Sequence, residues 1–199
     1  DRLRSRGLGD VYKRQAMDGT NWFSSFTIDK GSKEGIKKGM NVIAGSGLVG
    51  IVTDVGPNFA KVRSIIDDSS NVSSMVLTTK DNFNVGGSLK SMNQDKVLPF
   101  TELRDEDDKV KVGDPVVTSY VSDQYQEGIL IGYIASIEKN ANNLTKSGTI
   151  TPVVDFQHLR EVLVITTLKD TGEKELSSQK ASDTQAETQD NTETQKSQE

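Results

Sequence analysis

The stretch Phe26–Asp68 constrains the fold most, because it contains several short apolar runs separated by turn residues. Val49–Val55 and Ala60–Ile66 are rich in valine and isoleucine, and Gly56-Pro57 separates them. Runs of this length and composition, bounded by glycine, proline, asparagine or aspartate, are typical of short β-strands. Ile36–Met40 has room for one helical turn at most. We therefore expect a β-meander that begins a small barrel.

The residues Gly45–Gly50 spell GxGxxG, the pattern of dinucleotide-binding loops. Such a loop must follow a strand and open a helix, so that the helix N-terminus meets the pyrophosphate. The residues after Gly50 are β-branched and end at Gly56-Pro57, which leaves no length for a helix. A hairpin explains these glycines better, because glycine adopts positive φ without a steric penalty.

Further short apolar runs predict strands along most of the remaining chain. They are Phe26–Ile28, Val72–Leu77, Asn82–Leu89, Val97–Leu103, Val110–Val112, Val116–Ser119, Ile129–Ile137, Ile150–Val154 and Val162–Leu168. Gly86 and Gly87 predict a bulge or bend in their strand. Pro99 predicts an edge strand, because proline cannot donate a hydrogen bond. No apolar stripe with helical period persists for three turns, so the fold class expected is all-β.

An internal similarity suggests that the β-structure contains two related units. Gly39–Ala44 resembles Gly113–Thr118, and Gly50–Val55 resembles Gly132–Ile137. A repeat this long predicts two small barrels or sandwiches rather than a solenoid, and barrel closure removes exposed strand edges. Within residues 16–170 we expect a first unit at about 22–72, with a possible C-terminal return, and a second at about 73–148. Trp22 is expected to plug one end of a barrel.

Both ends of the chain are expected to lie outside this domain. Residues 1–15 include a string that one reading frame of a common sequencing adapter would encode, so we interpret them as an artefact or a disordered basic arm. Residues 171–199 are mostly polar and acidic, with a single leucine. Such a segment cannot bury enough apolar surface to offset its ordering entropy, so a disordered acidic tail is predicted.

Composition limits the possible functions. A formal net charge of -5 argues against a nucleic-acid binder, which would carry a basic face. The absence of cysteine excludes disulfides and thiolate chemistry, and fits an extracytoplasmic domain without requiring one. No apolar run approaches the roughly 20 residues of a membrane-spanning helix, and no signal peptide is visible. Any membrane anchor would have to lie outside this sequence.

The sequence offers little support for catalysis or metal binding. His158 is the only histidine, no serine sits in a GxSxG elbow, and a zinc site needs three or four ligands. Lys146-Ser147-Gly148 and Ser69-Ser70-Asn71 are similar to two motifs of penicillin-binding enzymes. The required Ser-x-x-Lys occurs only after them, at Ser177–Lys180, so the match is interpreted as chance. Asp105–Asp108 lacks the spacing of a calcium loop and is expected to be a solvated hairpin tip.

Several blocks of the chain form a recognisable series. They are Ile28–Ser32, Gly35–Met40, Gly47–Gly50, Lys61–Asp67, Asn71–Ser73, Val112–Ser119, Gly128–Gly132 and Pro152–Phe156. Taken together and in order, they strongly resemble the extracytoplasmic domain of the rod shape-determining protein MreC family. The resemblance covers about Phe26 to Ile165. The chain departs from the family pattern at Tyr120 and at Tyr125-Gln126.

The resemblance implies a non-enzymatic scaffold of the bacterial cell-elongation complex. Family members are anchored by an N-terminal transmembrane helix, followed by a dimerising coiled coil and two β-domains outside the cytoplasmic membrane. The implied partners are a second copy in a homodimer or filament, a class B penicillin-binding protein, MreD and other elongation proteins. The implied fold is a double barrel likened to chymotrypsin-type proteases. No catalytic, cofactor-binding or metal-binding residue is expected.

Partner-contact residues are not assigned by the sequence. Exposed aromatic residues would be candidates, because aromatic side chains concentrate binding energy at interfaces. Phe59, Phe83, Tyr120 and Tyr125 meet this description, but each is equally compatible with a core position. Two other functions stay open at this point, namely a degenerate serine-protease-like hydrolase and a carbohydrate-binding module of the cell wall. The second is weakened by the lack of a tyrosine or tryptophan platform.

Overall fold

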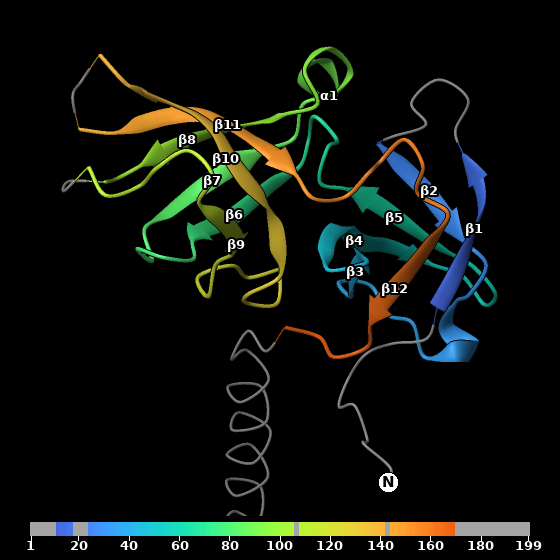
Figure 1. The fold of residues 1–199 in the computed structure, drawn as a ribbon. Coiled ribbons are helices and arrows are strands. Elements are labelled where there is room, and N and C mark those ends of the chain that lie inside the picture. Colours follow the sequence, from blue (N-terminus) through green and yellow to red (C-terminus); the bar gives the residue numbers. More distant parts are fainter. Residues whose placement is uncertain (1–10, 18–23, 106–107, 142–143, 170–199) are drawn as a thin grey trace, which may run out of the picture. The chain divides into compact units, whose positions relative to one another are not determined.

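The computed structural model describes residues 11–17, 24–105, 108–141 and 144–169. Within these ranges it contains β-strands, one short α-helix and one 3-10 turn (Figure 1). The strands are β1 Val11–Met17, β2 Ser25–Ile28, β3 Asn41–Ala44, β4 Gly47–Val55, β5 Ala60–Ser64, β6 Asn71–Val76, β7 Asn82–Gly86, β8 Leu98–Leu103, β9 Pro115–Thr118, β10 Leu130–Lys139, β11 Lys146–Pro152 and β12 Glu161–Ile165. The helix α1 is Leu89–Gln94, and the 3-10 turn is Ser32–Glu34. The all-β prediction is confirmed.

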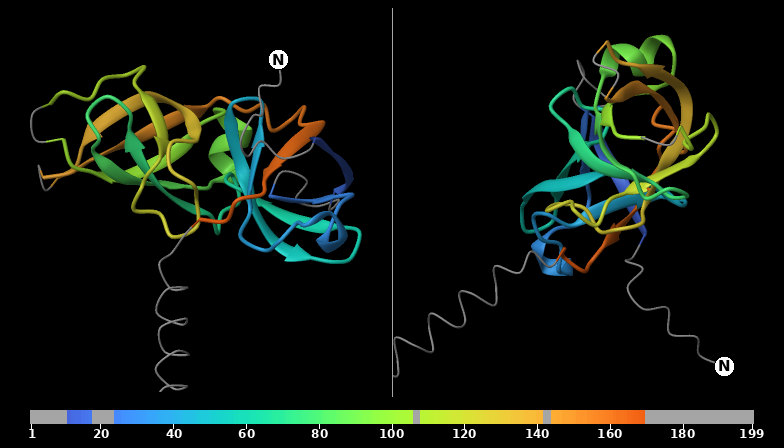
Figure 2. Two further views of the ribbon diagram at one scale, coloured as in Figure 1. Left: turned by 90° about the horizontal axis from the view of Figure 1, so that it is seen from below. Right: turned by 90° about the vertical axis from the view of Figure 1, so that its left-hand side faces the viewer.

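Strands β6 to β11 form a closed six-stranded barrel. They pair in the order β11-β8-β7-β6-β9-β10, and β10 pairs again with β11 to close the ring. Figure 2 shows these strands, coloured green to orange, from two further sides. Closure gives every strand a partner on both sides, so the barrel has no long exposed edge.

The other strands form a second set, called here the N-terminal set and consisting of β1–β5 and β12. Its pairing order is β4-β3-β12-β1-β2-β5, with a further pairing between β4 and β5. Strand β12 comes from the end of the described chain yet lies between β3 and β1 (Figure 1). A single parallel pair, Leu130↔Gly47, joins β10 to β4. The chymotrypsin-like double barrel and its unit boundaries stay predictions.

The two sets of strands pair in the same registers. In the N-terminal set Asn41 pairs with Ile51 and Val42 with Gly50, and the barrel has Pro115 with Tyr133 and Val116 with Gly132. The correspondence continues from the β4–β5 ladder to the β10–β11 ladder, including one register shift in each. The matched pairs are Ile51↔Arg63 with Tyr133↔Thr151, Val52↔Val62 with Ile134↔Ile150, and Asp54↔Lys61 with Ser136↔Thr149. The internal sequence similarity therefore reflects equivalent strands.

The turn before each matched hairpin is also the same. Gly39 and Gly113 adopt φ of 88° and 94°, a region that glycine enters without strain. The Gly39 amide donates to the Val52 carbonyl, and the Gly113 amide donates to the Ile134 carbonyl. Each of those strand residues donates back to the residue that follows the glycine. Equivalent glycines thus form the same turn in both sets.

The GxGxxG pattern is part of a hairpin, as the sequence predicted. Gly45, with φ of 56°, lies in the turn between β3 and β4, and strand β4 begins at Gly47. A Cβ at Gly47 would lie 2.5 Å from side-chain atoms of both Val153 and Val154. The glycine therefore allows close packing and opens no helix to which a phosphate could bind.

Three details of the sequence-based strand assignment are wrong. Val110–Val112 is not a strand: Val110 is buried, while Val112 is 65 % exposed. The strand expected at Asn82–Leu89 ends at Gly86, and α1 follows because the Ser88 hydroxyl accepts a hydrogen bond from the Ser91 amide. Pro99 is not on an edge strand, since β8 pairs with both β7 and β11. Only Phe100 and Thr101 of β8 pair with β7, so Pro99 pairs with β11 alone.

The remaining expectations concern the turn near Ile36, Trp22 and the two ends of the chain. The helical turn near Ile36–Met40 is replaced by the 3-10 turn at Ser32–Glu34. Residues 11–15 of the segment interpreted as an artefact or disordered arm lie in β1, because both neighbouring strands offer backbone partners. This pairing does not bear on the origin of the segment. The predictions for Trp22 and for the tail at 171–199 lie outside the described residues.

Candidate partner-binding surface

The structure separates the four aromatic candidates into two buried and two exposed residues. Phe83 and Tyr125 are 4 % and 2 % exposed, and both belong to the hydrophobic core. Phe83 packs against Phe100 with ring centroids 5.1 Å apart. Phe59 and Tyr120 are 43 % and 55 % exposed. Only the latter two can meet a partner without rearrangement.

Tyr125 is buried because the connection between β9 and β10 folds over the N-terminal set. This connection, residues 119–129, is called here the covering loop. The Asn41 side-chain amide donates to the Gln124 carbonyl at 2.9 Å, and its oxygen accepts from the Gln126 amide at 2.6 Å. Burial raises the pKa of Tyr125 to about 12, against an opposing effect of the Arg63 guanidinium. The loop is therefore held on the N-terminal set by specific hydrogen bonds to Asn41 of β3.

The outward-facing residues under the covering loop form a row across four strands. We call Ile165, Asn41, Ile51 and Arg63 the covered row. Asn41 is 1 % exposed and Ile51 is 5 % exposed, and Ile51 belongs to the same apolar cluster as Tyr125. The row lies on the outer wall of the strand set, and its two central residues are buried by the chain itself, while Ile165 and Arg63 at its ends are partly exposed.

The equivalent row on the barrel is exposed. The matched registers place Pro115, Tyr133 and Thr151 where the covered row has Asn41, Ile51 and Arg63. Leu77 takes the place of Ile165, because its amide donates to the Pro115 carbonyl directly after the Val76↔Val116 pair. These four residues are called the open row. Leu77 and Tyr133 are 44 % and 45 % exposed.

A groove of about 540 Å³ lies on another part of the barrel. Tyr120 stands beside it, with its hydroxyl 3.5 Å from the Asn82 side-chain nitrogen. Most of the lining side chains are polar. The lining residues are Ser73, Ser74, Asn82, Phe83, Asn84, Glu102, Arg104, Ser119, Val121 and Thr145. Exposed hydrogen-bonding groups around a buried aromatic floor can accommodate a polar segment of another molecule.

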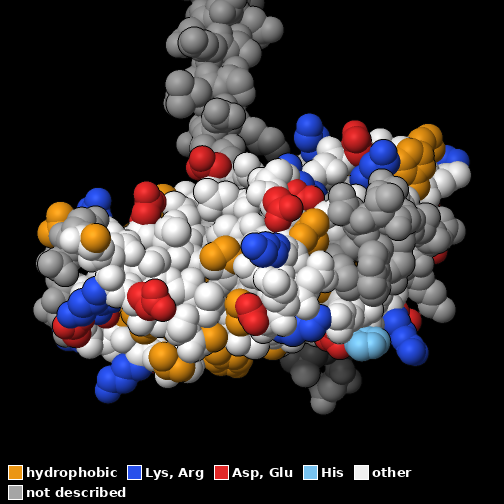
Figure 3. Space-filling view, turned by 90° about the horizontal axis from the view of Figure 1, so that it is seen from above, with side chains coloured by type: hydrophobic (Ala, Val, Ile, Leu, Met, Phe, Trp, Pro, Cys, Tyr) orange, Lys and Arg blue, Asp and Glu red, His pale blue; other side chains and the backbone are white. Residues whose placement is uncertain are grey.

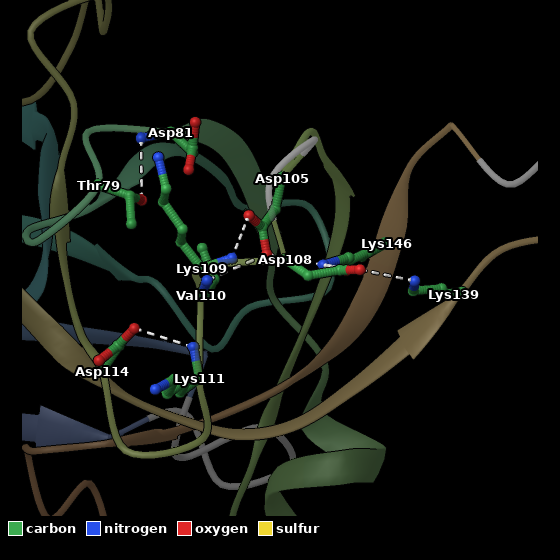
Figure 4. A network of polar contacts seen from close by, with 10 residues as sticks. All are labelled: Thr79, Asp81, Asp105, Asp108, Lys109, Val110, Lys111, Asp114, Lys139 and Lys146. Carbon is green, nitrogen blue, oxygen red and sulfur yellow. Dashed lines mark hydrogen bonds and ion pairs between the residues drawn. The ribbon is translucent and has the colours of Figure 1, made fainter.

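An ion-pair network holds one end of this groove (Figure 4). The Lys146 ammonium lies 2.7 Å from the Asp105 carboxylate, and both side chains are less than a tenth exposed. Lys146 also pairs with Asp108, which in turn lies 3.0 Å from the Lys139 ammonium on the surface. Asp105 accepts further bonds from the backbone amides of Lys109 and Val110. The network thus ties the β8–β9 connection to β11.

The charges in this network stabilise each other. Burial alone would raise the pKa of Asp105, but the hydrogen bonds from Lys146 and from two backbone amides hold it below the ordinary value. Burial likewise opposes the charge of Lys146, yet its bonds to Asp105 and Asp108 raise its pKa. Both groups are therefore ionised at neutral pH.

The expectation of a solvated acidic tip is wrong for Asp105. The residue is 7 % exposed, because Lys146 reaches it from β11, 41 positions away in the sequence. Lys146, which belongs to the chance match with a motif of penicillin-binding enzymes, thus has a structural role. Arg104 and Thr145 directly precede the paired residues and line the groove. The pair therefore fixes the position of this part of the groove wall.

The single histidine lies in an exposed pair with a neighbouring aspartate. The His158 Nδ1 atom lies 2.7 Å from the Asp155 carboxylate, three residues earlier, and both side chains are more than half exposed. Hydrogen bonding to His158 lowers the pKa of Asp155. In the part of the chain described, no group of three or more His, Asp and Glu side chains is placed to hold a metal ion. The pair therefore belongs to a surface turn.

Surface charge gives no sign of a nucleic-acid interface on the face shown in Figure 3. Basic and acidic side chains are interspersed there, and hydrophobic side chains gather in small groups between them. A nucleic-acid binder would concentrate lysine and arginine on one face. Within the described ranges, no helix has both the length and the apolar character to cross a membrane.

Comparison with protein families gives one match over most of the chain. Residues 16–166 match the family "Rod shape-determining protein MreC, barrel core". The cell shape-determining protein MreC of Listeria monocytogenes is 34 % identical over 148 residues, which cover 73 % of this chain and 49 % of that protein. The chain thus spans about half the length of the curated relatives it matches.

Solved structures of similar fold include two MreC structures. A structure of Listeria MreC has a TM-score of 0.71 at 31 % identity, covering 83 % of this chain and 80 % of that one. MreC in a complex with the penicillin-binding protein PBP2, from Helicobacter pylori, has a TM-score of 0.57 at 14 % identity. That match covers 79 % of this chain and 99 % of the other, and at this identity it shows the fold alone.

Proposed function

This chain belongs to the MreC family of rod shape-determining proteins, and from this premise we propose that it is a non-enzymatic scaffold of the bacterial cell-elongation complex. Its β-domain organises peptidoglycan-synthesising enzymes on the outer side of the cytoplasmic membrane. An N-terminal helix and a coiled coil of the whole protein anchor and pair it. The domain holds a class B penicillin-binding protein, with MreD and a second copy as further partners.

The observation that carries this proposal is the family match, which covers residues 16–166 and so every described strand except the first part of β1. The Helicobacter neighbour, which is bound to PBP2, supports the choice of partner class. The structure adds two surfaces that could receive a protein, the open row and the polar groove. A scaffold of this kind acts by stabilising one conformation of its partner, a population shift that requires no chemistry of its own.

The test is co-purification of the full-length gene product from a membrane extract, followed by identification of the bound proteins. The proposal predicts recovery of a class B penicillin-binding protein and MreD. The purified β-domain should also be inert toward peptide and ester substrates. Hydrolysis that disappears in His158→Ala, without recovery of elongation proteins, would contradict the scaffold and favour the hydrolase instead.

A further inference from the structure

The polar groove crosses neighbouring strands on the wall of the barrel. Residues of β6 and β7 form its floor, Glu102 and Arg104 border it on the β8 side, and Ser119 and Val121 border it beyond the end of β9. Neighbouring strands lie about 4.8 Å apart, so the lining from β8 to β9 extends for roughly 14 Å. The groove therefore has the length to receive an extended ligand.

The floor of the groove offers side chains, and not backbone groups, to a ligand. Strand β7 pairs with β6 and β8, and β6 pairs with β7 and β9. A peptide therefore cannot bind here by adding a strand to an open sheet edge. The groups available are carboxamides and a hydroxyl, from exposed Asn82 and from the part-exposed Asn84 and Ser73.

The two charges in the groove have opposite signs. Glu102 and Arg104 are both exposed, and the other lining side chains are uncharged. A polyanion would meet the like charge of the carboxylate, and a polycation would meet that of the guanidinium. The groove therefore favours an uncharged ligand that carries many hydrogen-bonding groups, and a glycan fits this description.

A strained backbone directs the Glu102 carboxylate to the floor of the groove. Glu102 has a φ of 64°, in the left-handed region that residues other than glycine rarely adopt. It lies in a β-bulge, in which Thr101 and Glu102 oppose the single residue Ser147 of β11. Its carboxylate accepts a bond from the Asn84 side-chain nitrogen at 3.3 Å, long enough for a ligand hydroxyl to replace it. Strain of this kind is concentrated at functional sites.

An exposed aromatic ring stands at the other side of the groove. Tyr120 is 55 % exposed, with its hydroxyl 3.5 Å from the Asn82 side-chain nitrogen, and the Ser119 hydroxyl donates to the Asn82 oxygen. The face of an aromatic ring is electron-rich and attracts the C–H groups of a sugar ring. Val121 beside it is 58 % exposed and adds an apolar contact. An acetamido group matches this end, because it combines an amide for Asn82 with a methyl group for Val121.

We propose that the polar groove binds a glycan of N-acetylated hexosamines, the sugar class of the bacterial cell wall. One sugar ring packs on Tyr120, and its acetamido group bonds Asn82 and contacts Val121. The hydroxyls of the next sugar bond Asn84 and Glu102. This inference goes beyond the proposed function, because it assigns a sugar ligand and requires no protein partner.

The test measures binding of the 199-residue chain to a soluble N-acetylglucosamine oligomer by isothermal titration calorimetry. We expect saturable binding, and at least tenfold weaker binding of a glucose oligomer of the same length and linkage. Tyr120→Ala and Asn84→Ala should each weaken binding of the acetylated oligomer at least tenfold. Tyr133→Ala is the matched control, because Tyr133 is 45 % exposed on the same barrel but does not line the groove. It should stay within twofold of the wild type.

Glu102→Gly separates sugar binding from folding. Glycine adopts the left-handed conformation without strain, so this variant should unfold at a higher temperature than the wild type. Because it also lacks the carboxylate, it should bind the oligomer at least fivefold more weakly. Unchanged binding together with a lower unfolding temperature would show that Glu102 serves the fold alone, and would overturn its place in the site.

The remaining outcomes decide the ligand and the site. Absence of saturable binding by the wild type overturns the proposal, and so does equal binding of the glucose oligomer. Equal affinities of Tyr120→Ala, Asn84→Ala and the wild type would place the sugar outside the groove. If the oligomer does not bind and the same variants lose a protein in co-purification, the groove is a protein interface instead. The scaffold function is tested by recovery of elongation proteins, so it stands even if the sugar does not bind.

Discussion

The N-terminal set and the barrel share their strand registers but differ in what their outer walls meet. The N-terminal set includes β12, which comes from near the end of the described chain, and its covered row lies beneath residues 119–129. The barrel has an exposed row at the same positions, and stabilises its β8–β9 connection through the pair between Asp105 and Lys146. Equivalent backbones thus support different surfaces, and side chains at a few matched positions decide which surface is available to a partner.

The largest predicted effect concerns the pair that only the barrel contains. Lys146→Met leaves the buried Asp105 carboxylate without its partner, and should cost about 3–5 kcal/mol of the free energy of unfolding. Lys139→Met removes an exposed ion pair and should cost less than about 1 kcal/mol. Urea denaturation of the wild type and of the two variants measures both changes in the free energy of unfolding. Equal effects of the two substitutions would mean that Asp105 is solvated.

The equivalence of the two sets can be tested at a pair of matched glycines. A Cβ at Gly50 would lie 2.0 Å from the Arg63 carbonyl oxygen, and one at Gly132 would lie 2.1 Å from that of Thr151. Gly50→Ala and Gly132→Ala should therefore each force strand movement and cost about 1–3 kcal/mol or more.

The control for this pair is Gly86→Ala. The added methyl group there meets Pro99 only at ordinary van der Waals distance, 3.9 Å from its carbonyl oxygen. It should change stability by less than about 1 kcal/mol. If only one of the two matched glycines were sensitive in chemical denaturation, the equivalence of the strands would not extend to their packing.

The covering loop offers a further way to sharpen the comparison. Asn41→Ala removes the side chain that bonds both the Gln124 carbonyl and the Gln126 amide, and so takes a partner from two part-buried backbone groups of the loop. We expect a loss of about 2 kcal/mol and faster hydrogen exchange at the Gln126 amide. Pro115→Ala, at the matched position of the barrel, should leave exchange in this loop unchanged. Unchanged exchange at Gln126 in Asn41→Ala would show that apolar packing alone holds the loop.

The smallest predicted effect is a pH dependence of the same loop. The pKa of Tyr125 is raised to about 12 by burial, so its neutral form is favoured in the folded state. Its contribution to stability is complete below the ordinary tyrosine pKa of about 10, and is lost as the pH rises from there toward 12. Spectrophotometric titration should show one tyrosine ionising near pH 12. In Asn41→Ala this late step should move toward pH 10.

Local sequence patterns predicted most strands but not the surfaces between them. Valine and isoleucine runs bounded by turn residues identified β4, β5 and β10, because the pattern that indicates these strands lies in neighbouring residues. Val110–Val112 has the same composition, yet the Asp105 carboxylate accepts the Val110 amide and no strand forms. The Asp105–Lys146 pair and the exposure of Tyr133 depend on residues distant in sequence. The internal similarity was the one signal that could have matched Tyr133 with Ile51 before the structure was known.

The most direct test of the account is hydroxyl-radical footprinting of the tyrosines, with and without the extracytoplasmic region of the penicillin-binding protein. In the free chain, Tyr120 and Tyr133 should be oxidised readily, and Tyr125, which is 2 % exposed, should be protected. Addition of the partner should protect at least one of Tyr120 and Tyr133, which lie beside the polar groove and in the open row. Unchanged oxidation of both tyrosines in the complex would contradict the proposal that one of these two surfaces receives the partner.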